Sequence, residues 1–151
     1  MQLPKNWPLQ LIQLLSIPGM FLAYYLLIYH NGLLFSVCEP NGLEDCGLVS
    51  GPGARYSSIG PIPVALIGLV GYIVIFLTIW LKAWVQFIDD YLPELILGLT
   101  GIAFLFSAYL TALETFIIHA YCRYCLVSAG IIVIMLILAI IHLRNANKSI
   151  A

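Results

Sequence analysis

The chain has 151 residues, of which 62% are hydrophobic and only 9% are charged, and its mean hydropathy is +1.03. A soluble domain carries about 25% charged residues, so this composition excludes a water-exposed globular surface and indicates a membrane protein. The net charge of −1 gives no basis for binding nucleic acid. The length leaves no room for an additional soluble domain, so we expect a single integral membrane domain over residues 1–151.

Four apolar runs are each long enough to cross a bilayer as a helix, which takes about 20 residues. In chain order they cover residues 9–29, 62–81, 95–118 and 122–143. Their hydrophobicity is continuous rather than alternating, which favours helices over a closed barrel. Pro61 and Pro63 open the second run, at positions where a missing N–H costs little. We therefore predict an all-α membrane protein, a bundle of four transmembrane helices.

Lysine and arginine residues predict the orientation of this bundle. If the N-terminus is cytoplasmic, four basic residues lie inside and two lie outside, which is the bias expected for membrane proteins. The inner set is Lys5, Lys82, Arg144 and Lys148, and the outer set is Arg55 and Arg123. Both termini are then cytoplasmic, and the loop between the first two helices, from about residue 30 to residue 60, is extracytoplasmic.

Glycines recur in the second and third runs, at Gly68, Gly71, Gly98 and Gly101. Small residues of this kind let membrane helices approach each other closely. Glycine is also frequent in membrane helices in general. Both interpretations stay open at the level of sequence.

The four cysteines form two pairs. Cys38 and Cys46 lie in the outer loop with seven residues between them, and Cys122 and Cys125 open the fourth helix as Cys-Arg-Tyr-Cys. On the predicted orientation both pairs are extracytoplasmic, in a compartment that permits disulfides. The N-terminus of a helix stabilises a thiolate, which makes Cys122 and Cys125 a reactive pair. Purely structural disulfides are the alternative. We expect no metal, because zinc sites favour tighter spacings than that of the loop pair.

Apart from Arg123 at the very start of the fourth span, Glu114 is the only formally charged residue in a predicted span, and a charge within the membrane suggests a functional role. It could pass protons to a bound molecule, bond to Arg123 or to backbone N–H groups, or reach water at the interface. His119, in the outer turn, could donate a hydrogen bond or take up a proton, or it could be solvated. His30 and His142 end the first and last runs, where we expect them at the membrane interface.

In this order, these features resemble the bacterial and archaeal homologues of vitamin K epoxide reductase. The resemblance covers nearly the whole chain. It rests on the loop pair of cysteines, the run Gly-Pro-Ile-Pro-Val-Ala-Leu-Ile-Gly-Leu at residues 60–69, Leu113-Glu-Thr115, and Cys122-Arg-Tyr-Cys125. Other quinone-linked disulfide oxidases of bacterial membranes place the Cys-x-x-Cys pair first, which is the reverse of the order here.

The resemblance implies a bundle around a quinone, ubiquinone or menaquinone, in a bacterial or archaeal plasma membrane. It implies a thiol:quinone oxidoreductase, which oxidises dithiols, reduces the quinone and supports disulfide formation. Cys122 and Cys125 match the active-site pair, with Cys125 nearest the quinone, and Cys38 and Cys46 match the pair that exchanges with a partner. Many bacterial members carry a fused thioredoxin-like domain after a fifth span, whereas this chain ends at Ala151. We therefore expect the partner to be a separate extracytoplasmic thioredoxin-fold (DsbA-like) protein.

An outer-loop serine usually hydrogen-bonds the quinone oxygen in this family. The sequence after the second loop cysteine departs from the usual spacing, so Ser50, Ser57 and Ser58 are all candidates for this contact. Ser57 or Ser58 could instead cap the helix that follows. Glu114 and His119 are the other candidates for contact with the quinone.

Animal enzymes of this family have a tyrosine four residues after the second active-site cysteine, where this chain has Ala129. This difference favours plain quinone reduction over epoxide reduction. Three questions stay open at the level of sequence. The reaction could run in the opposite direction, a disulfide could join Cys46 to Cys122 instead of linking each pair internally, and the chain could be a non-catalytic membrane subunit with structural disulfides.

Overall fold

The computed structural model describes residues 6–33, 49–51 and 53–150. The loop cysteines Cys38 and Cys46 lie outside these residues, so everything predicted for them stays a prediction. The other predicted site residues lie inside the described part of the chain.

Within the described residues, four helices are long and apolar enough to cross a membrane. They are α1 (Trp7–His30), α3 (Val64–Leu81), α5 (Leu92–Leu113) with its π-helical continuation η1 (Glu114–Ile118), and α6 (Arg123–Ile150). A short helix, α4 (Gln86–Asp90), joins α3 to α5. The shortest span has 18 residues, or about 27 Å at 1.5 Å per residue, which is close to the thickness of a bilayer core. The predicted four-helix membrane bundle is confirmed.

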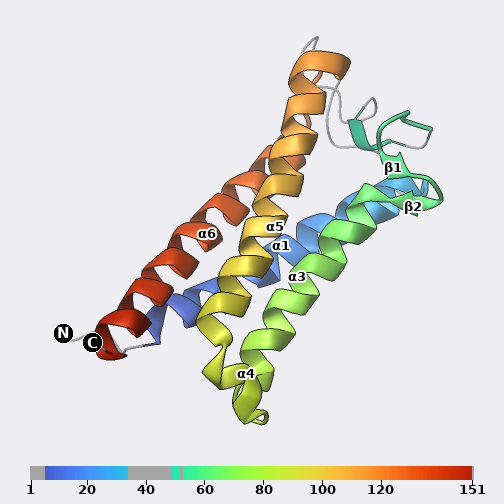
Figure 1. Ribbon diagram of the computed structural model, residues 1–151. Coiled ribbons are helices and arrows are strands. Elements are labelled where there is room, and N and C mark those ends of the chain that lie inside the picture. Colours follow the sequence, from blue (N-terminus) through green and yellow to red (C-terminus); the bar gives the residue numbers. More distant parts are fainter. Residues whose placement is uncertain (1–5, 34–48, 52, 151) are drawn as a thin grey trace.

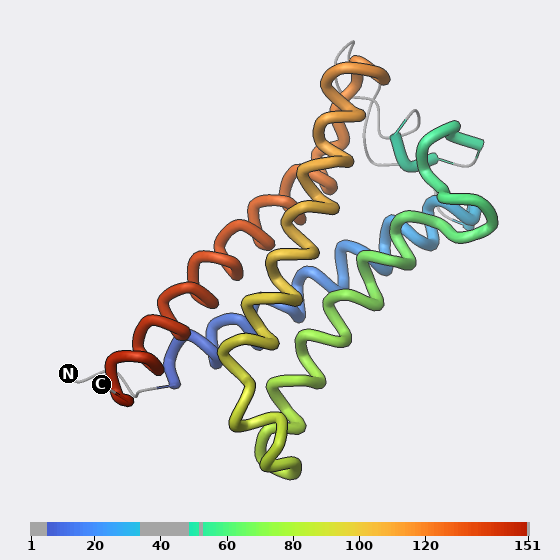
Figure 2. The backbone as a smooth tube through the Cα atoms, viewed as in Figure 1, coloured from blue at the N-terminus to red at the C-terminus, as the bar shows by residue number. Residues whose placement is uncertain are grey.

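The helices alternate in direction (Figures 1 and 2), with α1 beside α3 and α5 beside α6. One end of the bundle holds the start of α1, the end of α6 and the α3–α5 connection. At the opposite end η1 leads into α6, and a small cluster forms there from Leu26, Tyr29, Val49, Ala120 and Cys122. We call this the cysteine end. The arrangement is the one that the four predicted spans require.

A small hairpin precedes α3 and was not predicted. Strand β1 (Ser58–Ile59) pairs antiparallel with β2 (Ile62–Pro63), with Ser58 opposite Pro63 and Ile59 opposite Ile62. Gly60 supports the turn because its φ of 62° lies in the left-handed region that favours glycine. Pro61 therefore belongs to this turn instead of opening the helix, whereas Pro63 is the residue that caps α3. The hairpin brings the chain back to the cysteine end of the bundle.

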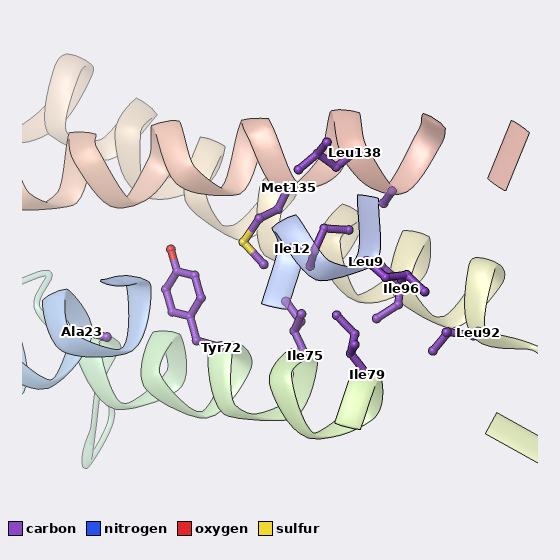
Figure 3. Close-up of a cluster of buried hydrophobic side chains, with 11 residues drawn as sticks. Leu9, Ile12, Ala23, Tyr72, Ile75, Ile79, Leu92, Ile96, Met135 and Leu138 are labelled. Atoms are coloured by element: carbon purple, nitrogen blue, oxygen red, sulfur yellow. The ribbon is translucent and has the colours of Figure 1, made fainter. Parts of the chain in front are cut away.

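The main core lies where all four helices meet (Figure 3), and Ala23 and Tyr72 lie on its side nearest the cysteine end. The Tyr72 side chain is 3% exposed, and its hydroxyl lies 2.7 Å from the Ser128 hydroxyl of α6. A Cβ atom at Gly19 of α1 would overlap the Tyr72 ring. Tyr72 thus ties three helices together, and glycine at position 19 is what lets its ring approach α1.

The glycines of the second and third spans do not serve close packing. A Cβ atom added at Gly68, Gly71, Gly98 or Gly101 would meet nothing within 4 Å. The interpretation of these four as helix-contact residues is therefore wrong, and the close approach occurs at Gly19 instead. Gly68 and Gly71 instead line a cavity.

Candidate functional site

The start of α6 places Cys122 and Cys125 one helical turn apart. Cys122 immediately precedes the helix, and its carbonyl accepts a hydrogen bond from the N–H of Leu126 at 3.0 Å. The N–H of Cys125 donates to the Cys122 Sγ at 3.4 Å. The sulfur therefore occupies the place of an N-cap side chain and satisfies one of the free N–H groups at the helix start.

The two thiols have different surroundings. Both are free cysteines in this structure. Cys122 has an exposed fraction of 0% and packs into the cluster at the cysteine end. Cys125 is only partly buried, and it lines the cavity between the helices. Cys122 is therefore enclosed by protein, whereas Cys125 faces a space where a small molecule can bind.

Ser50 is the serine that contacts the pair. Its Oγ atom lies 3.5 Å from the Cys125 Sγ and donates a longer hydrogen bond to the Cys122 Sγ at 3.9 Å. Ser50 also lines the cavity, and the preceding residue, Val49, packs against the cysteine cluster. The part of the outer loop that contains Val49 and Ser50 thus packs directly on the two cysteines.

The other two predicted serines have different positions. Ser57 is buried and lines the cavity, but its hydroxyl donates to the Ala54 carbonyl at 2.9 Å. Its own carbonyl accepts the N–H of Val64 at 2.9 Å, so Ser57 holds the hairpin against the start of α3. Ser58 lies in β1 and is not among the residues that line the cavity. Neither is hydrogen-bonded to a described sulfur atom.

Glu114 opens the π-helical turn η1 and is 3% exposed. Its Oε2 atom accepts a hydrogen bond from the backbone N–H of Cys122 at 3.4 Å, and its side chain lines the cavity. Turns of π-helix inside long helices are frequent at functional sites. Of the roles predicted for Glu114, the one that the structure shows directly is the bond to a backbone N–H group.

His119 follows the π turn in a left-handed conformation with φ 54°. It is exposed and is not among the cavity residues. This backbone conformation reverses the direction of the chain towards α6. The structure therefore separates the two polar candidates of this turn, because Glu114 lines the cavity and His119 is exposed outside that lining.

Cys122 lies outside the four membrane spans, immediately before the last of them. The hydrogen bond from the Cys125 thiol lowers the pKa of Cys122, and the Cys125 N–H and the Ser50 hydroxyl act in the same direction. Burial and the charge of Glu114 act against this shift, but the pKa of Cys122 still falls below its ordinary value. The Cys122 thiol is thus more readily deprotonated than an ordinary cysteine.

The cavity has a volume of about 360 Å³ and lies chiefly between α3 and α5, with contributions from α1 and α6. Its lining is mostly apolar, and the polar side chains that line it at the cysteine end include His30, Ser50, Ser57 and Glu114. Val74 and Ile102 line it too and are 39% and 69% exposed, so the cavity is open between α3 and α5. Its size and lining are typical of sites for small apolar molecules.

Sequence reasoning missed the place of His30 in this lining. Ala23, Leu26 and His30 all line the cavity and follow one another at spacings of three and four residues, so they share one face of α1. That periodicity is present in the sequence. It points to a lining face only once the position of the cavity is known, because apolar residues are spread around the whole of α1.

A model of the vitamin K epoxide reductase family matches residues 10–140 of the chain. This match confirms the resemblance that the cysteine pairs and the flanking motifs indicated. No curated protein matches the chain. Since the family model covers most of the sequence and includes at least part of each of the four membrane helices in the described residues, the chain belongs to the vitamin K epoxide reductase family.

Proposed function

We propose that this protein is a thiol:quinone oxidoreductase that oxidises an extracytoplasmic thioredoxin-fold protein and reduces a membrane quinone, either ubiquinone or menaquinone. Family membership and the four apolar helices make it a membrane thiol–disulfide oxidoreductase. The quinone, the partner and the direction of electron flow are the proposed parts. The reaction would support the formation of disulfide bonds outside the cytoplasm.

One observation carries the proposal. Cys125 lines an apolar cavity that is open between α3 and α5, and the Ser50 hydroxyl contacts its sulfur at 3.5 Å. A thiol at the wall of such a cavity can exchange electrons with an apolar molecule that enters from the lipid. Its neighbour Cys122 is enclosed by protein and has no such access.

The cavity fits a quinone in size and in chemistry. A volume of about 360 Å³ lies in the range of sites for small molecules, and the apolar lining suits a ring with an isoprenoid tail. Ser50 and Glu114 place polar atoms at the cysteine end, where a ring oxygen needs them. A bound quinone would supply an acceptor for two electrons and two protons. The residues that would hold its ring are Ser50, Glu114 and Cys125.

The relay to the loop pair is supported by the reach of the chain. Cys46 precedes Val49 by three residues, and three residues span at most about 11 Å. Val49 packs in the cluster that contains Cys122, so the length of the chain alone limits how far Cys46 can lie from that cluster. In the proposed exchange the partner's thiolate attacks Cys38 of the Cys38–Cys46 disulfide and releases Cys46 as a thiolate, and the partner's second thiol then displaces Cys38 and closes the partner's own disulfide. In a second attack on a disulfide of this chain, the Cys46 thiolate attacks Cys122 of a Cys122–Cys125 disulfide.

That second attack forms a Cys46–Cys122 bond and releases Cys125 as a thiolate beside the cavity. Cys38 then attacks Cys46, which restores the loop disulfide and leaves Cys122 and Cys125 as a dithiol. The dithiol gives up two electrons and two protons when it closes again to a disulfide. Ser50 is placed to donate a hydrogen bond to whichever sulfur carries the negative charge, because its hydroxyl reaches both.

The test is quinone reduction by the purified full chain in lipid nanodiscs, with ubiquinone-1 as acceptor and either dithiothreitol or a reduced thioredoxin-fold protein as donor. Cys125→Ser should abolish turnover with both donors. Cys38→Ser should be mild with dithiothreitol and severe with the protein donor. Full activity of Cys125→Ser would refute the assignment of Cys125 as the residue that reduces the quinone. Equal effects of Cys38→Ser with the two donors would exclude a relay through the loop pair.

The rival function, a membrane subunit with structural disulfides, makes a different prediction. Thiol trapping in membranes would then find one fully oxidised form under all conditions. An enzyme of the proposed kind should show a mixture of oxidised and reduced cysteines that shifts towards the reduced form when quinone is depleted. This measurement requires no knowledge of the natural partner.

A further inference from the structure

We propose that His30 is a ligand-binding residue of this cavity and that its Nδ1 atom forms a hydrogen bond with an oxygen of the quinone ring. The inference rests on the proposed function, since it assigns a further contact to the same cavity. Neither the spacing of the cysteines nor the polar residues beside them pointed to this histidine.

The position of His30 places its side chain at the cavity. It is the last residue of α1, on the same helix face as Ala23 and Leu26, and all three line the cavity. Val49, Ser50 and Glu114 line it as well. His30 therefore reaches the cavity from α1, whereas Cys125 reaches it from α6.

The hydrogen bonding of His30 is incomplete. Its Nδ1 atom is buried and has no hydrogen-bond partner among the described residues. Buried polar atoms in proteins are almost always paired, and an exception calls for an explanation. Ser50, Ser57 and Glu114 differ from His30 in this respect, because each already has a protein partner within the site. The unpaired nitrogen is thus available for a polar atom of a molecule in the cavity.

Imidazole suits both forms of a quinone. In its neutral state one ring nitrogen donates a hydrogen bond and the other accepts one. An Nδ1–H tautomer donates to the carbonyl oxygen of a quinone, and an unprotonated Nδ1 accepts from the hydroxyl of a quinol. A change of tautomer therefore preserves the contact through the reaction. The apolar lining excludes competing polar contacts over most of the remaining cavity surface.

The experiment measures binding of ubiquinone-1 to the oxidised full chain in nanodiscs by equilibrium dialysis, so that no turnover occurs. His30→Phe keeps a ring of similar size and removes both nitrogens. Its Kd should rise about tenfold, which corresponds to about 1.4 kcal/mol. His30→Asn carries its polar atoms at the δ position and should stay within about threefold of the natural protein.

His119→Phe is the matched control, since His119 is exposed outside the cavity, and its Kd should be unchanged. If His30→Phe does not fold, His30→Gln replaces it, because its polar atoms lie one carbon further from the backbone. In steady state the KM for ubiquinone-1 should rise in His30→Phe, while the KM for dithiothreitol should not change.

An unchanged Kd in His30→Phe, or an equal loss in His30→Asn, would overturn the role of His30. If the natural protein binds ubiquinone-1 but does not reduce it, the proposed function is overturned. The Kd values of the His30 variants then still test whether His30 contacts the quinone. If the natural protein bound neither ubiquinone-1 nor menaquinone-1, both the proposed function and the role of His30 would be overturned.

Discussion

Replacing Glu114 separates a structural role of this residue from a role in proton transfer. The carboxylate is 3% exposed and accepts the N–H of Cys122 at 3.4 Å. Glu114→Ala leaves that N–H without a partner, and a buried donor left unpaired costs about 1–3 kcal/mol. Because 3.4 Å exceeds the usual range of about 2.7–3.2 Å, we expect a loss near the lower limit, about 1 kcal/mol. Glu114→Gln retains an acceptor oxygen and should lose less than about 1 kcal/mol.

The two variants should differ little in quinone reduction if Glu114 handles a proton. A general acid or base contributes about 10²–10⁴-fold to a rate, so both should lower kcat by about 10²-fold or more. Unfolding of the purified protein by sodium dodecyl sulfate, followed by circular dichroism, measures stability, and ubiquinone-1 reduction measures activity. Glu94→Gln is the control, since Glu94 is exposed at the opposite end of α5. Full activity of Glu114→Gln would refute the proton-transfer role and leave only the bond to Cys122.

Two further predictions follow from the packing of the bundle and from the thiol pair. Gly19→Ala should destabilise the protein by about 1–3 kcal/mol, because the added methyl group overlaps the Tyr72 ring. Gly68→Ala is the control and should not be destabilising, because a Cβ atom there meets nothing within 4 Å. Equal midpoints of detergent denaturation for the two variants would contradict this prediction. Ser50→Ala should raise the pKa of Cys122, because the Ser50 hydroxyl contributes to lowering it, and thiolate absorbance at 240 nm in the reduced protein should therefore appear at higher pH. An unchanged titration curve would show that the Ser50 contact does not affect the thiolate.

Hydropathy was sufficient to predict the fold, since burying backbone polar groups in lipid leaves few alternatives to a helical bundle. It was less reliable for the ends of the helices. The last helix was expected to end near Leu143, where the apolar run stops, yet α6 continues to Ile150. The residues after Leu143 include no proline or glycine that would end a helix, so the helix can extend beyond the apolar run. The hairpin before α3 escaped detection because two-residue strands are too short to show alternation.

The cysteine pair on α6 was predictable because a spacing of three residues is one helical turn wherever the helix begins. Which of the three serines contacts the two sulfurs was not predictable, since that depends on how the outer loop packs on α6, and the serine that contacts a quinone stays a prediction. In the structure Ser50 contacts the sulfurs, while Ser57 bonds within its own turn. His30 was expected at the membrane interface. Its place in the cavity lining follows from contacts between helices, which a single sequence does not contain.

The central claim is that Cys122 and Cys125 alone pass electrons to a quinone. A single turnover measures this directly. The variant with Cys38→Ser and Cys46→Ser is reduced, freed of reductant and mixed with one equivalent of ubiquinone-1 without oxygen. We predict one quinone reduced per chain and a Cys122–Cys125 disulfide detected by mass spectrometry. If the natural protein reduces the quinone and this variant does not, the loop pair takes part in the quinone step and the claim is wrong.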